Sequence, residues 1–164
     1  QDEVARDLLQ RLADQADEAM DDRIYKDAGQ PATASPGAIP ASLQNFAQTA
    51  LQALVKDPQR WQRALGESLS EPKPQVWFQP GTDDLPSGGV VLDKRSRMMY
   101  DEAHIYLNGE SWRASGADAR LMRALADQRA LSAQQLAKSS QGARDLLRDW
   151  CAAGWVHGKS TCSA

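Results

Sequence analysis

Histidine and cysteine are scarce in this sequence, whose 164 residues include only two of each. A non-haem iron site needs two histidines and a carboxylate, usually with a His-x-Asp or His-x-Glu step, but His104 precedes Ile-Tyr and His157 precedes Gly-Lys. Cys151, His157 and Cys162 lack the Cys-x-x-Cys spacing of a zinc site. We therefore expect no metal site, and we interpret Cys151 as a small core residue of a helix.

Other signatures are missing as well. The sequence has no G-x-S-x-G, no P-loop and no G-x-G-x-x-G, so it predicts no catalytic or cofactor-binding residues. No run of apolar residues is long enough to cross a membrane, and two cysteines are too few for a disulfide framework. The first residues lack both an initiator methionine and a secretory signal. We interpret the chain as a cytoplasmic protein and as a piece of a longer one.

Three helices are predicted in the first half, over residues 2–20, 41–56 and 59–69, from apolar residues at helical spacing. Acidic residues crowd the end of the first helix, which indicates either a solvated face or a surface for a basic partner. The second and third helices carry more large apolar residues than a unit of about 70 residues readily buries alone. We expect this unit to form a homodimer through Leu43, Phe46, Ala50, Leu54, Trp61 and Leu65.

The segment Ser70–Phe78, SEPKPQVWF, contains two prolines one residue apart. Each proline fixes its own φ, lacks an amide donor and disfavours helix at the preceding residue. The segment therefore ends the third helix and runs extended. We interpret it as the boundary between two structural units; the alternative is a proline-rich ligand for an aromatic groove.

The second half mixes strands and helices. Short strands are predicted near 90–92, 97–101, 104–107 and 111–114, with Asn108-Gly109 as a type I′ hairpin turn. Helices follow over 117–128, 132–139 and 142–153, and Gly154 ends the last one before an edge strand over 155–157. The fold class is thus α+β, mostly α: a helical dimerisation unit (1–72), a linker (73–87) and a winged-helix-like domain (88–164) with a short β-hairpin sheet.

The last predicted helix has little net charge for a DNA-reading helix. Arg144 and Arg148 are each followed by an aspartate, and acidic neighbours weaken contacts with phosphates. Residues 117–164 as a whole are nevertheless positive by three. We expect no specific binding of duplex DNA and favour a contact with protein or ribosome, with duplex recognition as the alternative.

The sequence resembles the bacterial ribosomal oxygenases of the JmjC/cupin type over nearly its whole length. The resemblance is carried by ADEAMDDRIYKDAG, SEPKPQVWF and the run from LDKRSRMMYDEAHIYLNGESWR to ADQRAL. It is most specific at Glu71-Pro72-Lys73-Pro74, Arg95-Ser96-Arg97-Met98 and Asn108-Gly109-Glu110-Ser111. Members of this family are iron(II)- and 2-oxoglutarate-dependent hydroxylases of an arginine on a large-subunit ribosomal protein.

The resemblance implies that the chain is the C-terminal part of such an enzyme. The family has an N-terminal cupin domain with the iron site, then a helical dimerisation domain and a winged helix, and only the last two have counterparts here. The His-x-Asp…His ligands have none, so iron and 2-oxoglutarate are implied for the parent alone. A parent of this kind acts on a ribosomal protein substrate. The alternative is a free-standing winged-helix transcriptional regulator with a helical dimerisation arm.

Overall fold

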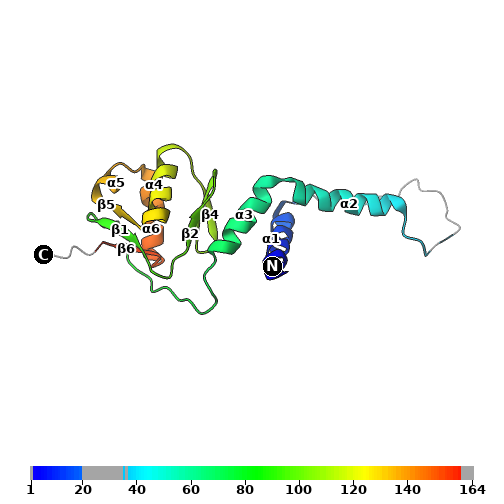
Figure 1. Cartoon of the computed structure of the whole chain (residues 1–164), viewed down its shortest axis with the longest axis horizontal. Coiled ribbons are helices and arrows are strands. Elements are labelled where there is room, and N and C mark those ends of the chain that lie inside the picture. The colour runs from blue at the N-terminus through cyan, green and yellow to red at the C-terminus, as the bar shows by residue number, and fades with distance from the viewer. Residues whose placement is uncertain (1, 20–34, 36, 160–164) are drawn as a thin grey trace. The chain divides into compact units, whose positions relative to one another are not determined.

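The computed structural model describes residues 2–19, 35 and 37–159 (Figure 1), and the chain divides into two compact units, Gln1–Leu65 and Gly66–Ala164. The loop predicted between the first two helices lies mostly outside the described residues, as does Cys162. In the part that is described, the first unit contains helices and no strand, whereas the second contains three-stranded sheets and helices.

The first unit consists of α1 (Asp2–Ala19), α2 (Ala41–Lys56) and most of α3 (Pro58–Ser70), so the three predicted helices are confirmed. Pro40 precedes α2, and the Asp57 carboxylate accepts a hydrogen bond from the Gln59 N–H at 3.0 Å. This bond satisfies one of the unpaired donors at the beginning of α3. Of the stripe predicted on α1, Leu12 and Ala16 are buried.

The last turns of α3 belong to the second unit, so the division falls earlier in the chain than the predicted boundary at residue 72. Gly66 lies so close to the ring of Tyr106 that a Cβ there would overlap with it. The Ser70 hydroxyl accepts from the Gly109 N–H at 3.1 Å, and the Ser111 hydroxyl donates to Glu67 at 2.6 Å. These contacts attach the end of α3 to the hairpin around Gly109.

The second unit contains two small antiparallel sheets. One has the order β2-β3-β4, with β2 at Met98–Tyr100, β3 at His104–Leu107 and β4 at Glu110–Arg113. Asn108 and Gly109 have φ of 52° and 92°, which confirms the type I′ turn. The other has the order β5-β1-β6, with β1 at Gly89–Leu92, β5 at Ala130–Ser132 and β6 at Val156–Gly158. This second sheet contains the strands predicted near 90–92 and 155–157 together with β5, which was not predicted.

Three helices pack with these sheets: α4 (Gly116–Gln128), α5 (Ala133–Ala137) and α6 (Gln141–Ala152) (Figure 1). Ser132 forms a capping box with Gln135 at the beginning of α5, and the Ser140 hydroxyl accepts from the Ala143 N–H at the beginning of α6. Both caps satisfy donors that a helix leaves unpaired. The helices and both sheets share one apolar core, which includes Val90, Ile105, Leu107, Met122, Leu125, Leu131, Leu147, Trp150, Cys151 and Val156.

Candidate functional site

The candidate site is the face of the helix-turn-helix α5–α6, because the second helix of this motif contacts the major groove in DNA-reading winged helices. Asp145 and Asp149 are exposed on α6. Arg148 forms an ion pair with Asp145 at 2.6 Å. Arg144 turns back to α5, where it donates to the Ala137 carbonyl at 3.0 Å and to the Ser139 hydroxyl at 3.2 Å. The exposed face of α6 therefore offers carboxylates where a DNA reader offers unpaired cations.

Several other arginines of the second unit donate to backbone carbonyls. Arg129 donates to the carbonyls of Asp93 and Ser96 at 2.7 and 3.1 Å. Arg123 donates to the carbonyls of Asp101 and Glu102 at 3.1 and 3.0 Å. Much of the positive charge counted in this part of the sequence thus holds loops in place, and less of it is available to phosphates than the composition indicates.

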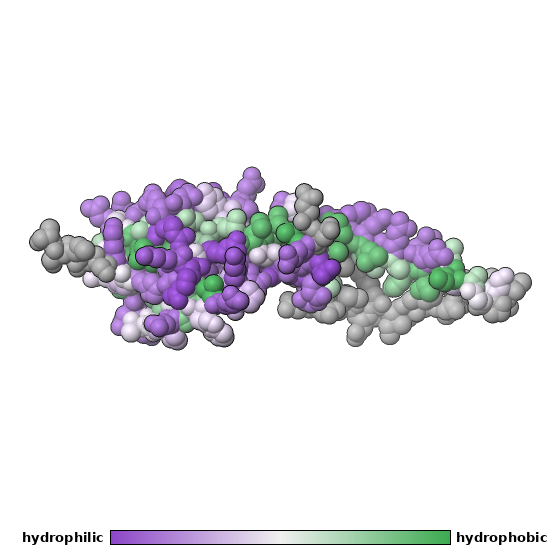
Figure 2. Space-filling model, turned by 60° about the horizontal axis from the view of Figure 1, so that its bottom comes forward, coloured by the Kyte–Doolittle hydropathy of each residue, from purple (hydrophilic) through white to green (hydrophobic). Residues whose placement is uncertain are grey.

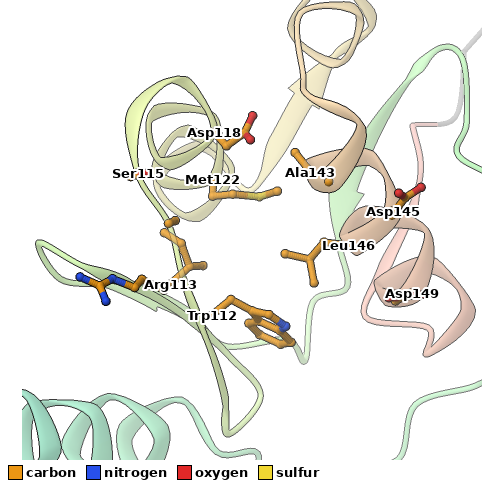
Figure 3. A pocket seen from close by; sticks show the side chains of 12 residues that line it. Trp112, Arg113, Ser115, Asp118, Met122, Ala143, Asp145, Leu146 and Asp149 are labelled. Atoms are coloured by element: carbon orange, nitrogen blue, oxygen red, sulfur yellow. The ribbon is translucent and has the colours of Figure 1, made fainter.

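A groove lies between the end of β4 and α6 (Figure 3). Its volume is about 490 Å³, and its apolar lining includes Ile105, Trp112, Ala114, Met122, Ala143 and Leu146. Asp118, Asp145 and Asp149 also line it, and the one basic lining residue, Arg113, directs its side chain away from the groove in Figure 3. Asp118 accepts a hydrogen bond from the Ser140 hydroxyl, and the Asp149 carboxylate has no side-chain partner among the described residues. The groove thus combines an apolar floor with an acidic rim.

A second polar cluster surrounds Asp93 in the turn after β1. Arg95 donates to both carboxylate oxygens of Asp93, at 2.8 and 2.9 Å, and His157 Nε2 lies 2.8 Å from Oδ2. Arg95 also donates to the Trp77 carbonyl at 2.6 Å and lies over the Phe78 ring at 5.4 Å. The hydrogen bonds from Arg95 hold the pKa of the Asp93 carboxyl well below its usual range. This cluster joins the β1–β2 turn to β6 and to the loop at residues 77–78.

The Asp93 cluster predicts acid sensitivity. Because the folded-state pKa of Asp93 is lowered, its ion pair stabilises the fold above the ordinary aspartate pKa of 3.8 and loses this contribution as the pH falls below it. Asp93→Asn should lower the free energy of unfolding at neutral pH by about 1.5–3 kcal/mol, the range for hydrogen bonds to a charged group. Below about pH 4, the free energy of unfolding of the Asp93→Asn variant should depend less on pH than that of the unmodified chain. Urea denaturation at several pH values measures both.

The control is Asp83→Asn, which removes the same charge from an exposed loop position. It should leave stability within about 0.5 kcal/mol of the unmodified chain. Equal losses in the two variants would show that the Asp93 cluster contributes nothing particular.

The residues predicted at a dimer interface lie on the helices of the first unit. Leu43, Phe46, Ala50 and Trp61 are exposed and Leu65 is half-buried, while the side chain of Leu54 lies outside the described residues. Leu51 and Val55, on the same face of α2, are 65% and 61% exposed. Figure 2 shows apolar side chains along one side of this helix and polar ones along the other.

The described residues do not fit an iron site. They include no group of three or more histidine, cysteine, aspartate or glutamate side chains that could hold a metal ion. His157 contacts Asp93, whereas His104 lies 3.6 Å from Asp101 in a separate part of the second unit. No helix among these described residues is both long and apolar enough to cross a bilayer.

Sequence analysis missed both polar features of the second unit. It treated Asp145 and Asp149 only as neighbours that neutralise arginines, although their spacing of four residues places them on one side of a helix. It also overlooked Asp93. An aspartate at the start of a turn often accepts a hydrogen bond from the backbone N–H two residues later, which is an Asx-turn, and here the Asp93 carboxylate accepts from the Arg95 N–H at 2.8 Å. The groove itself has no sequence signal, since α6 is distant in the chain from β4 and from the beginning of α4.

Comparison with solved structures finds the same fold in the protein YcfD of Escherichia coli. A crystal structure described as the ribosomal oxygenase YcfD matches with a TM-score of 0.75 and 19% identity, over 94% of this chain and 46% of that one. A structure of YcfD in complex with cobalt and 2-oxoglutarate matches with a TM-score of 0.74 and 19% identity, over 93% and 45%. The chain thus spans less than half of these proteins.

Comparison with curated proteins finds no match. Residues 50–157 match the family model described as the ROXA-like winged helix. This range includes the end of α2, α3, both sheets and the helix-turn-helix. The match covers more than half of the sequence, and the chain therefore belongs to the ROXA-like winged-helix family.

Proposed function

We propose that this chain is the non-catalytic C-terminal region of an iron(II)- and 2-oxoglutarate-dependent ribosomal protein arginine hydroxylase. The observation that carries the proposal is the match of 93–94% of the chain to YcfD structures, one of them named as a ribosomal oxygenase and another holding cobalt and 2-oxoglutarate. The family model supports the same assignment through the winged helix. The parent would act in the cytoplasm on a ribosomal protein, through a cupin domain that precedes this region.

The proposed role of the first unit is to form a homodimer. An isolated helix as short as α2, with 16 residues, is marginally stable in water unless its apolar face packs against something. Large apolar residues of α2 are exposed in the single chain, Leu51 and Val55 most of all. A symmetric partner is the commonest way to cover such a face, and a dimer would place two copies of the catalytic domain in one particle.

The proposed role of the second unit is to contact protein. The exposed carboxylates of α6 and the internal hydrogen bonds of Arg123, Arg129 and Arg144 disfavour contacts with phosphates. The same contacts disfavour a transcriptional regulator, which requires specific binding to duplex DNA. Binding of a particular duplex that survives about 150 mM salt would contradict it.

Metal binding and turnover test whether this chain lacks the iron site and the catalytic activity of the proposed parent. The isolated chain should retain no stoichiometric iron after desalting and should not decarboxylate 2-oxoglutarate, because it lacks the His-x-Asp…His ligands. Metal analysis and succinate formation measure both, with the full-length protein of the same gene as the positive control. Iron bound at one equivalent by the isolated chain, together with succinate formation, would contradict the assignment.

A further inference from the structure

We propose that the groove between β4 and α6 binds an extended peptide segment rich in lysine or arginine, which pairs with the edge of β4 as an added strand. The proposal goes beyond the function above because it assigns a binding site to this chain itself, independent of any catalytic domain. It rests on three observations: the free edge of β4, the apolar floor of the groove and the carboxylates on its rim.

The first observation concerns the backbone. The sheet order β2-β3-β4 leaves β4 at an edge in the part of the chain that the structure describes. Arg113 is paired with His104 across the ladder, and Ala114 donates to the Ala103 carbonyl at 3.0 Å. Because hydrogen-bonded and non-hydrogen-bonded pairs alternate in an antiparallel ladder, the N–H and C=O of Arg113 point away from β3. Arg113 lines the groove, so these groups are available to a strand lying in it.

The second observation concerns the floor. Ile105 and Met122 are almost fully buried, Trp112 and Leu146 are half-buried, and all four line the groove. Figure 3 shows Trp112, Met122 and Leu146 directed toward the space between β4 and α6. Side chains of an added strand alternate between the two faces of the sheet, so every second residue of the peptide would lie against this floor.

The third observation selects the charge of the partner. Three aspartates line the groove, and the side chain of its one basic lining residue, Arg113, is directed away from it (Figure 3). Asp145 is paired with Arg148, but the Asp149 carboxylate is exposed and without a side-chain partner among the described residues. A cationic side chain would gain a favourable interaction here, whereas an acidic peptide or a nucleic acid backbone would be repelled. The bound segment should therefore be cationic and contain lysine or arginine.

The test uses the 164-residue chain and two short end-capped peptides, one alternating valine with lysine and one alternating valine with glutamate. Fluorescence anisotropy at about 50 mM salt should show that the lysine peptide binds at least about tenfold more tightly. Combining Asp145→Asn with Asp149→Asn should weaken its binding about fivefold or more. The matched control, Asp83→Asn with Asp84→Asn, removes the same charge from an exposed loop and should leave binding unchanged.

Strand addition is tested separately at Arg113. Arg113→Pro removes the outward N–H and should weaken binding, although it also removes a positive charge. Arg113→Ala removes the charge alone and should maintain or strengthen binding of the lysine peptide. Hydrogen exchange gives a readout without substitution, because the amide of Arg113 should become protected when the peptide binds. Equal binding of both peptides, no binding at about 1 mM, or an unprotected Arg113 amide in the complex would overturn the proposal.

Discussion

Combining Leu51→Asp with Val55→Asp is expected to convert the chain from a dimer into a monomer. The two side chains lie one helical turn apart on α2 and are 65% and 61% exposed in the single chain. The fold of one copy therefore does not require them to be apolar. In the proposed dimer, each copy would have to bury two unpaired carboxylates, which is strongly unfavourable. We expect the dissociation constant to rise by about a hundredfold or more.

Light scattering coupled to gel filtration measures the mass at each concentration. The matched control combines Asn45→Asp with Thr49→Asp, two exposed positions with the same spacing on the polar side of α2, and it should remain a dimer. A monomeric mass for the unmodified chain at tens of micromolar, or a dimer that survives Leu51→Asp with Val55→Asp, would contradict the proposed role of α2.

Replacing Gly154 with alanine should cause a large loss of stability in the second unit. Gly154 follows α6 with φ of 74°, and a Cβ there would overlap with the Gln79 carbonyl oxygen. The left-handed conformation alone costs a residue other than glycine about 1–3 kcal/mol, and forced displacement of a packed neighbour adds about 1–3 kcal/mol. We expect the free energy of unfolding to fall by about 2–6 kcal/mol.

Gly116→Ala is the matched control. Gly116 also has a positive φ, of 62°, but nothing lies within 4 Å of the position that its Cβ would occupy. This variant should therefore show only the conformational cost, about 1–3 kcal/mol. Urea denaturation followed by tryptophan fluorescence measures both. Equal losses for Gly154→Ala and Gly116→Ala would show that the loop at Gln79 yields without cost and is not packed against the end of α6.

The sequence predicts the elements that have their own local pattern. The α2 helix has apolar residues at helical spacing. The β3–β4 hairpin has Asn108-Gly109, a dipeptide that strongly favours the type I′ turn. In contrast, β5 was missed because its three residues, Ala130–Ser132, are too few to display a period. It forms because Leu131 pairs with Val90 of β1, a strand far earlier in the chain.

Packing contacts between distant segments also decide where the units divide. The prolines at Pro72 and Pro74 do end α3, as the sequence indicates. The boundary nevertheless falls at Gly66, because the absence of a side chain there lets α3 approach the ring of Tyr106. Likewise, the Gly81 N–H donates to the Ala152 carbonyl at 2.9 Å, which joins the predicted linker to the end of α6. No local signal in the sequence reports these contacts.

The assignment to a ribosomal oxygenase is tested most directly by mass spectrometry of large-subunit ribosomal proteins. Ribosomal subunits would be incubated with iron(II), 2-oxoglutarate and either the full-length protein of this gene or the 164-residue chain alone. We predict one added oxygen atom on an arginine of a large-subunit protein with the full-length protein, and none with the chain alone. Unmodified ribosomal proteins in the presence of an iron-loaded full-length protein would contradict the assignment.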